Sequence, residues 1–449
     1  MIVIARPDTT AMVGDHDTVL LRRIAWRLVP LLTVIYLIAY IDRANVSYAK
    51  LTMVQALHMT EAEFGFAASI FFIGYLIFEV PSNLALNHFG ARPWIARIMF
   101  TWGLATVATA FVPTSTWFLV VRFVVGTCEA GLYPGIIFYL SMWFPQKQRT
   151  GIVGLLTLGS SLGNMFGSLI GGYSLELDGA WGYAGWQWVF LVTGTPAVLM
   201  TVVTLAFLPS TPKDARFLSE AERKTVAEAL RRDPPPPKPS GGAPWTFGSL
   251  LTVLALAIGY GTISIAIYGI AYWMPTLVKG FGVSSGTNGL LNMIPWALAS
   301  LVLFWLPRQL TSFRLVLQAA IAAAAIGIVL FLISISPVSN TVRFAALSLG
   351  APTLYLMIPC FWATPPRLLP AAFLKGAGGA AAMAVIVSGS ALGGFIAQNL
   401  MPWIAQASGS ASTPMIVPAG SLLLLGTAAF VVMLVTGSGR APSSASAAR

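Results

Sequence analysis

Charged residues are scarce in this 449-residue sequence, where they make up 9% of the chain. Soluble domains carry about 25%, so the composition excludes an ordinary soluble protein. The 57% hydrophobic share instead indicates a protein that crosses a bilayer several times. The two cysteines, Cys128 and Cys360, both fall inside apolar runs, so no disulfide framework is expected.

Other absences narrow the function. No Gly-x-x-x-x-Gly-Lys-Ser/Thr stretch is present, so the sequence shows no P-loop that could drive transport with ATP. The three histidines, His16, His58 and His88, fall in the N-terminal tail or in loops. An intramembrane enzyme would need a nucleophile and base, or metal ligands, at membrane depth. We therefore expect no enzyme, no cofactor and no metal.

Apolar runs of spanning length, about 20 residues each, predict twelve membrane spans. They lie near 28–48, 64–86, 94–112, 117–142, 151–175, 186–208, 247–275, 288–306, 315–335, 343–365, 377–403 and 414–436. The polar, mixed-charge start of the chain shows no cleavable signal peptide. An even number of spans puts both termini on the same side, which we expect to be the cytoplasm.

The basic residues support this topology. Arg43 and Arg122 fall within spans and Lys50, Lys279 and Arg343 at the outer side, which leaves 21 of the 26 basic residues at the inner side. Such a bias marks cytoplasmic loops. It also accounts for the net charge of +11 without a nucleic-acid partner. We expect a monomer in the cell inner membrane, surrounded by lipid.

Two ionisable residues lie inside the fourth span, Arg122 and Glu129. Seven residues of helix rise about 10.5 Å and complete almost two turns, so both side chains lie on one face. A charge at the centre of a span costs about 2.5–3.5 kcal/mol and usually faces a bundle interior or an aqueous path. We expect a functional site here; a purely architectural ion pair is the alternative.

The first span also carries charge. Tyr36, Tyr40, Arg43 and Ser47 follow one helical stripe, whereas Asp42 is rotated about 100° away from it. Arg43 and Asp42 should therefore meet different neighbours. The alternative is that both lie at the outer interface and extend toward water.

Two further spans have polar stripes whose roles stay open. In the second span, Glu79 lies toward the cytoplasmic end, where a gate contact and proton handling are both compatible with it. In the fifth, glycines recur every four residues over 159–171, a pattern that allows close helix packing. Asn164 beside them suits either a substrate contact or a hydrogen bond between helices.

The chain divides into three parts: a first bundle at 1–208, a charged and proline-rich cytoplasmic linker at 209–245, and a second bundle at 246–449. In the linker, Ser219 and Glu222 have capping-box spacing, which predicts an amphipathic helix to about Arg232, before the prolines at 234–237. The run Gly159-Ser-Ser-Leu-Gly163-Asn resembles Gly389-Ser-Ala-Leu-Gly393-Gly, so two six-span repeats are predicted. The second repeat has no Asp or Glu, so proton chemistry must reside in the first.

Several motifs together are typical of one family. They are Tyr40-Ile-Asp42-Arg43-Ala-Asn45-Val-Ser47, Phe71-Phe-Ile-Gly74-Tyr75-Leu-Ile-Phe-Glu79-Val-Pro81-Ser-Asn83, Gly90-Ala-Arg92-Pro-Trp94-Ile-Ala-Arg97, Arg122 through Gly135, Trp143-Phe-Pro145, Gly185-Trp-Gln-Trp-Val-Phe190 and Tyr268-Gly-Ile-Ala-Tyr-Trp273-Met-Pro275. The chain resembles, over nearly its whole length, the anion:cation symporters of the major facilitator superfamily, which include bacterial sugar-acid, tartrate and phthalate permeases.

The resemblance implies an all-α membrane protein of two pseudo-symmetric six-helix bundles. It also implies symport of a small organic anion with protons, by alternating access. Asp42 and Glu129 would carry protons, and Arg122 would meet the substrate carboxylate. The other candidate substrate contacts are Arg43, Tyr75, Tyr40, Asn164, Tyr268, Tyr272 and Ser388.

The sequence departs from the family pattern in its second half. The run at 387–391 has no asparagine, and the loop at 307–310 lacks the usual Asp-Arg pair. The loss of amide groups favours a less hydroxylated, more compact or more aromatic carboxylate than a sugar acid. An anion uniporter or exchanger, and a sensor that binds an anion without moving it, are the competing functions.

Overall fold

The computed structural model describes residues 9–232, 245–369, 373 and 377–438. Within these ranges the chain is nearly all helical and contains no strand. The helices are α1 (Thr9–Ala56), α2 (Glu61–Phe89), α3 (Ala91–Thr109), α4 (Ser115–Glu129), α5 (Leu132–Ser141), α6 (Gln146–Leu175), α7 (Gly185–Phe207), α8 (Glu220–Arg232), α9 (Phe247–Lys279), α10 (Ser285–Trp305), α11 (Phe313–Ile335), α12 (Asn340–Trp362), α13 (Pro365–Leu368), α15 (Ala377–Ser408) and α16 (Ile416–Ser438).

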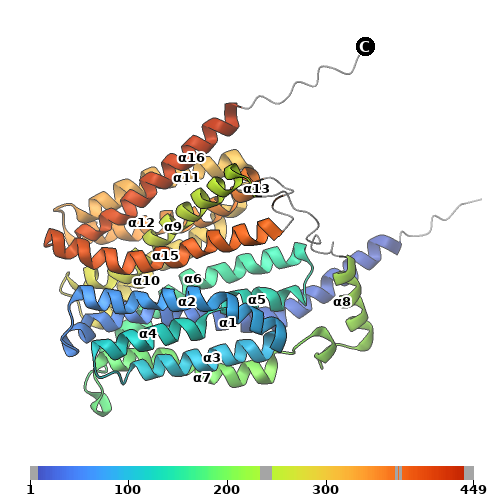
Figure 1. The fold of residues 1–449 in the computed structure, drawn as a ribbon, viewed down its shortest axis with the longest axis horizontal. Helices are drawn as coiled ribbons and strands as arrows, with labels where there is room; N and C mark the ends of the chain where they lie inside the picture. The colour runs from blue at the N-terminus through green and yellow to red at the C-terminus, as the bar shows by residue number, and fades with distance from the viewer. Residues whose placement is uncertain (1–8, 233–244, 370–372, 374–376, 439–449) are drawn as a thin grey trace, which may run out of the picture.

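Eleven segments of the described chain are long and apolar enough to cross a membrane, and each corresponds to a predicted span. The remaining prediction, 94–112, corresponds to α3, a 19-residue helix that carries Arg92 and Arg97 near its start. These charges lower the apolar character of a short helix. Figure 1 shows α3 running alongside α7 within the same bundle. The all-helical membrane fold is therefore confirmed.

Figure 1 shows the helices in two groups, with α1 to α7 in one and α9 to α16 in the other. The linker helix α8 lies at one end of the first group. It begins with the predicted capping box, because Ser219 and Glu222 each accept a hydrogen bond from the other's backbone N–H. Arg23 of α1 pairs with Glu222, and Arg27 lies 4.5 Å from the centre of the Phe217 ring. The domain boundaries proposed above remain a prediction, and the prolines at 234–237 lie outside the described residues.

The two groups repeat one packing arrangement. In the first, the four glycines of α6 meet α1: a Cβ on Gly163 would lie 2.3 Å from the Tyr40 Cβ atom. In the second, α15 meets α9: a Cβ on Gly389 would lie 2.3 Å from the Ala257 carbonyl oxygen, and one on Gly393 2.5 Å from that of Gly261. The repeat predicted from the glycine-rich runs is thus a repeat of helix contacts.

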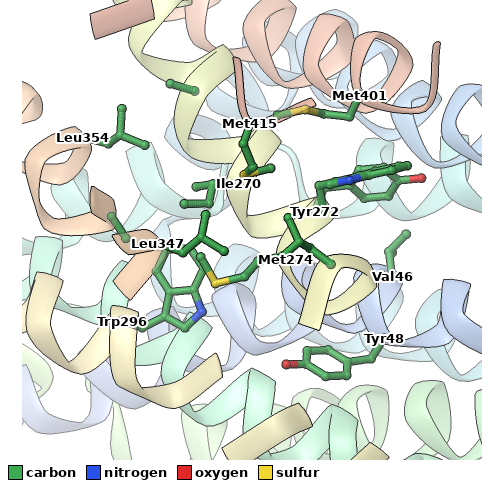
Figure 2. Close-up of a cluster of buried hydrophobic side chains, with 14 of the residues drawn as sticks. Val46, Tyr48, Ile270, Tyr272, Met274, Trp296, Leu347, Leu354, Met401 and Met415 are labelled. Atoms are coloured by element: carbon green, nitrogen blue, oxygen red, sulfur yellow. The ribbon is translucent and has the colours of Figure 1, made fainter. Parts of the chain in front are cut away.

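The hydrophobic core differs between the two ends of the molecule. At the end opposite α8, one cluster joins both groups; Figure 2 shows Val46 and Tyr48 of α1 with Tyr272 and Met274 of α9 in this cluster. Toward α8, one cluster belongs mainly to the first group and a separate one to the second. The bundles are therefore packed together at one end and apart at the other.

Apolar side chains also cover much of the outer surface. They include Ile77, Val202, Phe207, Ile258 and Val435, each more than half exposed. Large exposed apolar surfaces are uncommon on soluble monomers. On helices of spanning length, such a surface suits contact with lipid.

Close contact between α6 and α1 should not tolerate a side chain. We expect Gly163→Leu to lower thermal stability, because extra carbons in a packed interior cost about 1–3 kcal/mol or more. Gly154→Leu on the same helix is the matched control, since a Cβ there would meet nothing within 4 Å. Thermal unfolding of the two variants in detergent is the measurement. Equal melting temperatures would contradict the packing.

Candidate functional site

The fourth span is interrupted where its glutamate lies. α4 ends at Glu129, and α5 begins at Leu132 after Gly131, which has a φ of +88°. A Cβ on Gly131 would lie 2.3 Å from the Ser82 hydroxyl oxygen, so both conformation and space require glycine. The span predicted at 117–142 is confirmed, and it consists of two helices with a break between them. Broken helices inside membranes are common at transporter binding sites.

Two glycines bring α2 against α4. A Cβ on Gly74 would lie 2.5 Å from the Phe123 carbonyl oxygen, and one on Gly126 would lie 2.0 Å from that of Phe71. The backbones therefore touch, as small residues allow in membrane helices. This contact places Arg122 and Glu129 beside the aromatic residues of α2.

Glu129 is fully buried and forms an ion pair with Arg43 of α1. Arg43 donates to Glu129 Oε1 from Nε at 2.9 Å and from Nη2 at 2.6 Å. Its Nη1 donates to the Tyr268 hydroxyl of α9 at 3.2 Å, so this residue links the two bundles. Glu129 Oε2 has no hydrogen-bond partner among the described residues. Arg43 therefore pairs with an acid of a neighbouring helix.

Asp42 lies in a separate buried pocket and, as predicted, meets different neighbours from Arg43. Trp102 Nε1 donates to Oδ2 at 2.7 Å and Thr106 Oγ1 at 3.1 Å, while Asn45 Nδ2 donates to Oδ1 at 2.8 Å. Three donors therefore hold this carboxylate. Sequence reasoning missed Trp102 and Thr106 of α3; an indole N–H inside a predicted span, which needs an acceptor, was the available signal.

Arg122 is 4% exposed and lies behind an aromatic ring. Its guanidinium carbon is 4.9 Å from the centre of the Phe71 ring. It interacts electrostatically with both Asp42 and Glu129, but it does not line the cavities described below. Direct contact between Arg122 and the anion stays a prediction, whereas Arg43 lies in the cavity wall.

A central cavity separates the bundles at the level of Arg43. It has two connected chambers of about 90 and about 400 Å³, which share Tyr40, Arg43, Tyr260 and Tyr268 in their walls. Tyr75 lines the larger chamber, and Asn164 and Tyr272 line the smaller.

Six of the eight predicted substrate contacts line the central cavity, and Arg122 and Ser388 do not. The six are Arg43, Tyr40, Tyr75, Asn164, Tyr268 and Tyr272. Asn164 Nδ2 also donates to the Tyr355 hydroxyl at 3.0 Å, across the two bundles. Asn164 therefore forms a hydrogen bond between helices and also lines the cavity, while its contact with a substrate stays a prediction.

A second, larger cavity of about 940 Å³ extends from the central cavity toward α8. Glu79, Tyr133 and Val387 line both, so Glu79 lies at the passage between them. Ser388 lines only the larger cavity, and its hydroxyl donates to the Ala384 carbonyl oxygen. Leu230 of α8 lies in the same wall. The route from the central cavity therefore opens toward the linker helix.

The opposite end of the molecule is closed by contacts between the bundles. A Cβ on Gly172 of α6 would lie 2.7 Å from the Gly289 Cα atom of α10. Glu176 Oε1 accepts a hydrogen bond from the Gly286 N–H in the first turn of α10 at 2.7 Å. Lys279 Nζ donates to the Leu51 carbonyl oxygen at 3.1 Å. These contacts join the two bundles at the end opposite α8.

Lys50, which sequence reasoning placed at the outer side without a role, contributes to this closure. It is 2% exposed, and its Nζ lies 2.8 Å from Glu61 Oε2 and 3.8 Å from the centre of the Trp273 ring. Glu61 belongs to the first bundle and Trp273 to the second. The cation therefore joins the bundles through an aromatic face.

The family sequence model described as Major Facilitator Superfamily matches residues 32–391 of this chain. The chain belongs to this superfamily. It is therefore a multi-pass membrane transporter and not an enzyme.

Two relatives of this major facilitator cover most of the chain. One, from Agrobacterium vitis, is named for tartrate transport and is 36% identical over 92% of this chain and 90% of its own. The other, the inner membrane transport protein RhmT of Escherichia coli, is 34% identical over 83% of this chain and 86% of its own. Among solved structures, the inward-open xylose transporter XylE of Escherichia coli matches with a TM-score of 0.69. That match covers 90% of this chain and 95% of the other at 15% identity, so it supports the fold alone.

The Arg43–Glu129 pair should behave as a unit in this transporter. Breaking a buried ion pair costs about 3–5 kcal/mol, so we expect Arg43→Met to lower thermal stability strongly. Adding Glu129→Gln removes the unpaired charge and should restore part of the loss. Lys224→Met is the control, because its pair with Glu220 lies exposed on α8. Equal melting temperatures for the single and double variants would show that the two residues do not interact.

Proposed function

We propose that this transporter takes up a small organic carboxylate together with protons, by alternating access. One observation carries the proposal. Arg43 lines the central cavity, and its partner there is a fully buried carboxylate, Glu129, one oxygen of which has no hydrogen bond among the described residues. An anion that enters the cavity would therefore bind Arg43 in place of Glu129. Glu129, without its cation, would then take up a proton.

The coupling follows from the charges around the cavity. Asp42 and Glu129 balance Arg43 and Arg122 when both acids are ionised. A bound carboxylate adds a negative charge where screening is weak, and it competes with Glu129 for Arg43. Glu129 also lies at the C-terminal end of α4, where the helix dipole disfavours a negative charge. Uptake of a proton by Glu129 would leave the loaded site neutral.

The reverse step restores the original pair. When the anion and the proton leave toward the cytoplasm, Arg43 can bind Glu129 again, and no buried charge stays unpaired. Arg43 can form two parallel hydrogen bonds with a carboxylate, which a lysine cannot. Arg122, behind Phe71, would contribute its positive charge to the same site.

Asp42 is the second proposed proton site. Its three hydrogen-bond donors and its distance from the cavity lining separate it from the anion in this conformation. Exchange of its proton would then require the opposite conformation, with the bundles rearranged. Glu129 is the residue that would sense the substrate directly.

The cavity that opens toward α8 would face the cytoplasm. The basic residues gather at that end, and one relative is named as an inner membrane protein. We therefore propose an inward-open monomer in the cell inner membrane, with both termini in the cytoplasm.

Labelling tests this orientation. In a Cys128→Ser/Cys360→Ser background, we expect Ser388→Cys to react with a membrane-impermeant maleimide applied from the cytoplasmic side. Ala411→Cys, in a loop at the opposite end, is the control and should react from outside. The reverse pattern would overturn the proposed orientation.

Transport assays test the coupling. We expect proteoliposomes that are alkaline inside to accumulate at least one of radiolabelled gluconate, tartrate and 4-hydroxybenzoate, after subtraction of uptake into empty liposomes. Glu129→Gln mimics the protonated acid, so it should still exchange that anion across the membrane but lose accumulation driven by the pH gradient. Glu228→Gln on α8 is the control and should behave as the original protein.

Two outcomes would contradict the proposal. If Glu129→Gln and Asp42→Asn both concentrate the anion when protons are the only driving ion, proton coupling is wrong. If the original protein exchanges an anion but never accumulates it, the transporter is a uniporter or exchanger. Binding without any movement would identify a sensor.

A further inference from the structure

The residues that line the central cavity indicate which class of organic anion it binds. This inference rests on the function proposed above. We propose that the substrate is a monocarboxylate with an aromatic ring. Its carboxylate would bind Arg43, and its ring would lie between aromatic side chains of the two bundles. The charges, the hydrogen bonds and the aromatic groups of the cavity support this substrate class.

The cavity offers one positive charge. Among the described residues that line its two chambers, Arg43 is the only cation and Glu79 the only anion. A second carboxylate on the substrate would have no cation to meet, and it would come near Glu79. A buried charge without a partner is strongly disfavoured. The cavity therefore favours a monoanion over a dicarboxylate.

Several hydrogen-bonding side chains in the cavity are already engaged, whereas the Tyr272 hydroxyl and Gln398 Oε1 of the smaller chamber have no partner among the described residues. Asn164 donates to Ser160 and Tyr355, and Ser264 donates to Ser390 at 2.7 Å. The Tyr268 hydroxyl accepts from Arg43. A sugar acid would give up water at each of its hydroxyls and would find few free partners. Sites that recognise hydroxyl groups usually supply dedicated hydrogen bonds to them.

Aromatic rings face the cavity from both bundles. From the first, Tyr36 and Tyr133 lie 5.3 Å apart between ring centres. From the second, Tyr260 stacks on Phe361 at 5.2 Å and meets Trp362 edge-on at 5.1 Å. Tyr36, Tyr133, Tyr260 and Trp362 all line the larger chamber. Its volume of about 400 Å³ lies within the usual range of about 300–1,000 Å³ for small-molecule sites.

The position of these rings relative to Arg43 fits one compact molecule. Arg43 and the four rings line the same chamber, so a carboxylate at the guanidinium leaves its attached ring among them. Aromatic pairs prefer offset or edge-to-face contacts with centres about 4.5–7 Å apart. A saturated ring of equal size would fill the space but lose these contacts.

Calorimetric binding to the purified full-length protein tests the inference with four acids. Benzoate and cyclohexanecarboxylate have the same charge and similar size, phthalate adds a carboxylate, and gluconate carries hydroxyls. We expect benzoate to bind about tenfold more tightly than cyclohexanecarboxylate, at the upper end of what aromatic contacts supply. It should also bind more tightly than phthalate and gluconate.

Variants assign the preference to the cavity wall. Trp362→Leu and Tyr260→Leu keep Arg43, so they should still bind both ring acids, with a benzoate to cyclohexanecarboxylate ratio near one. Trp305→Leu is the control, because this tryptophan of α10 is 62% exposed and lines neither chamber. An unchanged ratio in both wall variants, with melting temperatures like that of the control, would overturn the inference.

Different results would contradict the aromatic substrate class and the proposed transport function. If gluconate, tartrate or phthalate binds more tightly than benzoate and is accumulated with protons, the aromatic assignment is wrong and the proposed transport stands. If none of these acids binds or moves, the proposed function itself is wrong.

Discussion

The burial of Glu129 against Arg43 is the constraint on which the rest of this structure depends. A carboxylate with no exposed surface requires a cation, and that cation lies on a different helix and reaches a tyrosine of the other bundle. The break after α4, the contact of α2 with α4 through Gly74 and Gly126, and the packing of α6 on α1 through glycines together fix the helices that carry the pair. Close contact between the helix backbones therefore sets the positions of the two charged residues.

The two bundles repeat their packing but not their chemistry. Glycines place α6 on α1 and α15 on α9 in the same way, whereas every acid of the chain lies in the first bundle or the linker. The second bundle contributes neutral and aromatic walls, among them Tyr260, Tyr268 and Trp362. In the function proposed above, the first bundle alone would handle charge, whereas both bundles supply aromatic side chains to the cavity wall.

Sequence reasoning predicted most of the fold because spans, basic loops and glycine spacing are local signals. It also identified six residues of the cavity wall, because polar residues inside spans usually face the interior of the bundle. It failed where the answer depended on three-dimensional neighbours. Helical periodicity placed Glu129 on one face with Arg122, but the contact that forms is with Arg43 on another helix. The break at Gly131 and the Trp102 bond to Asp42 likewise depend on packing that no single segment encodes.

At the closed end, backbone packing, hydrogen bonds from charged side chains to backbone groups and the Lys50–Trp273 contact join the bundles. The Gly172–Gly289 approach, the Glu176 bond to a backbone N–H and the Lys279 bond to a carbonyl join the bundles, and no ion pair between opposite side-chain charges does so among the described residues. Ion pairs at a surface weaken as salt screens them, whereas van der Waals packing does not. The equilibrium between this conformation and its alternative should therefore depend little on ionic strength. In the orientation proposed above, this suits a closed end that faces a medium that the cell does not control.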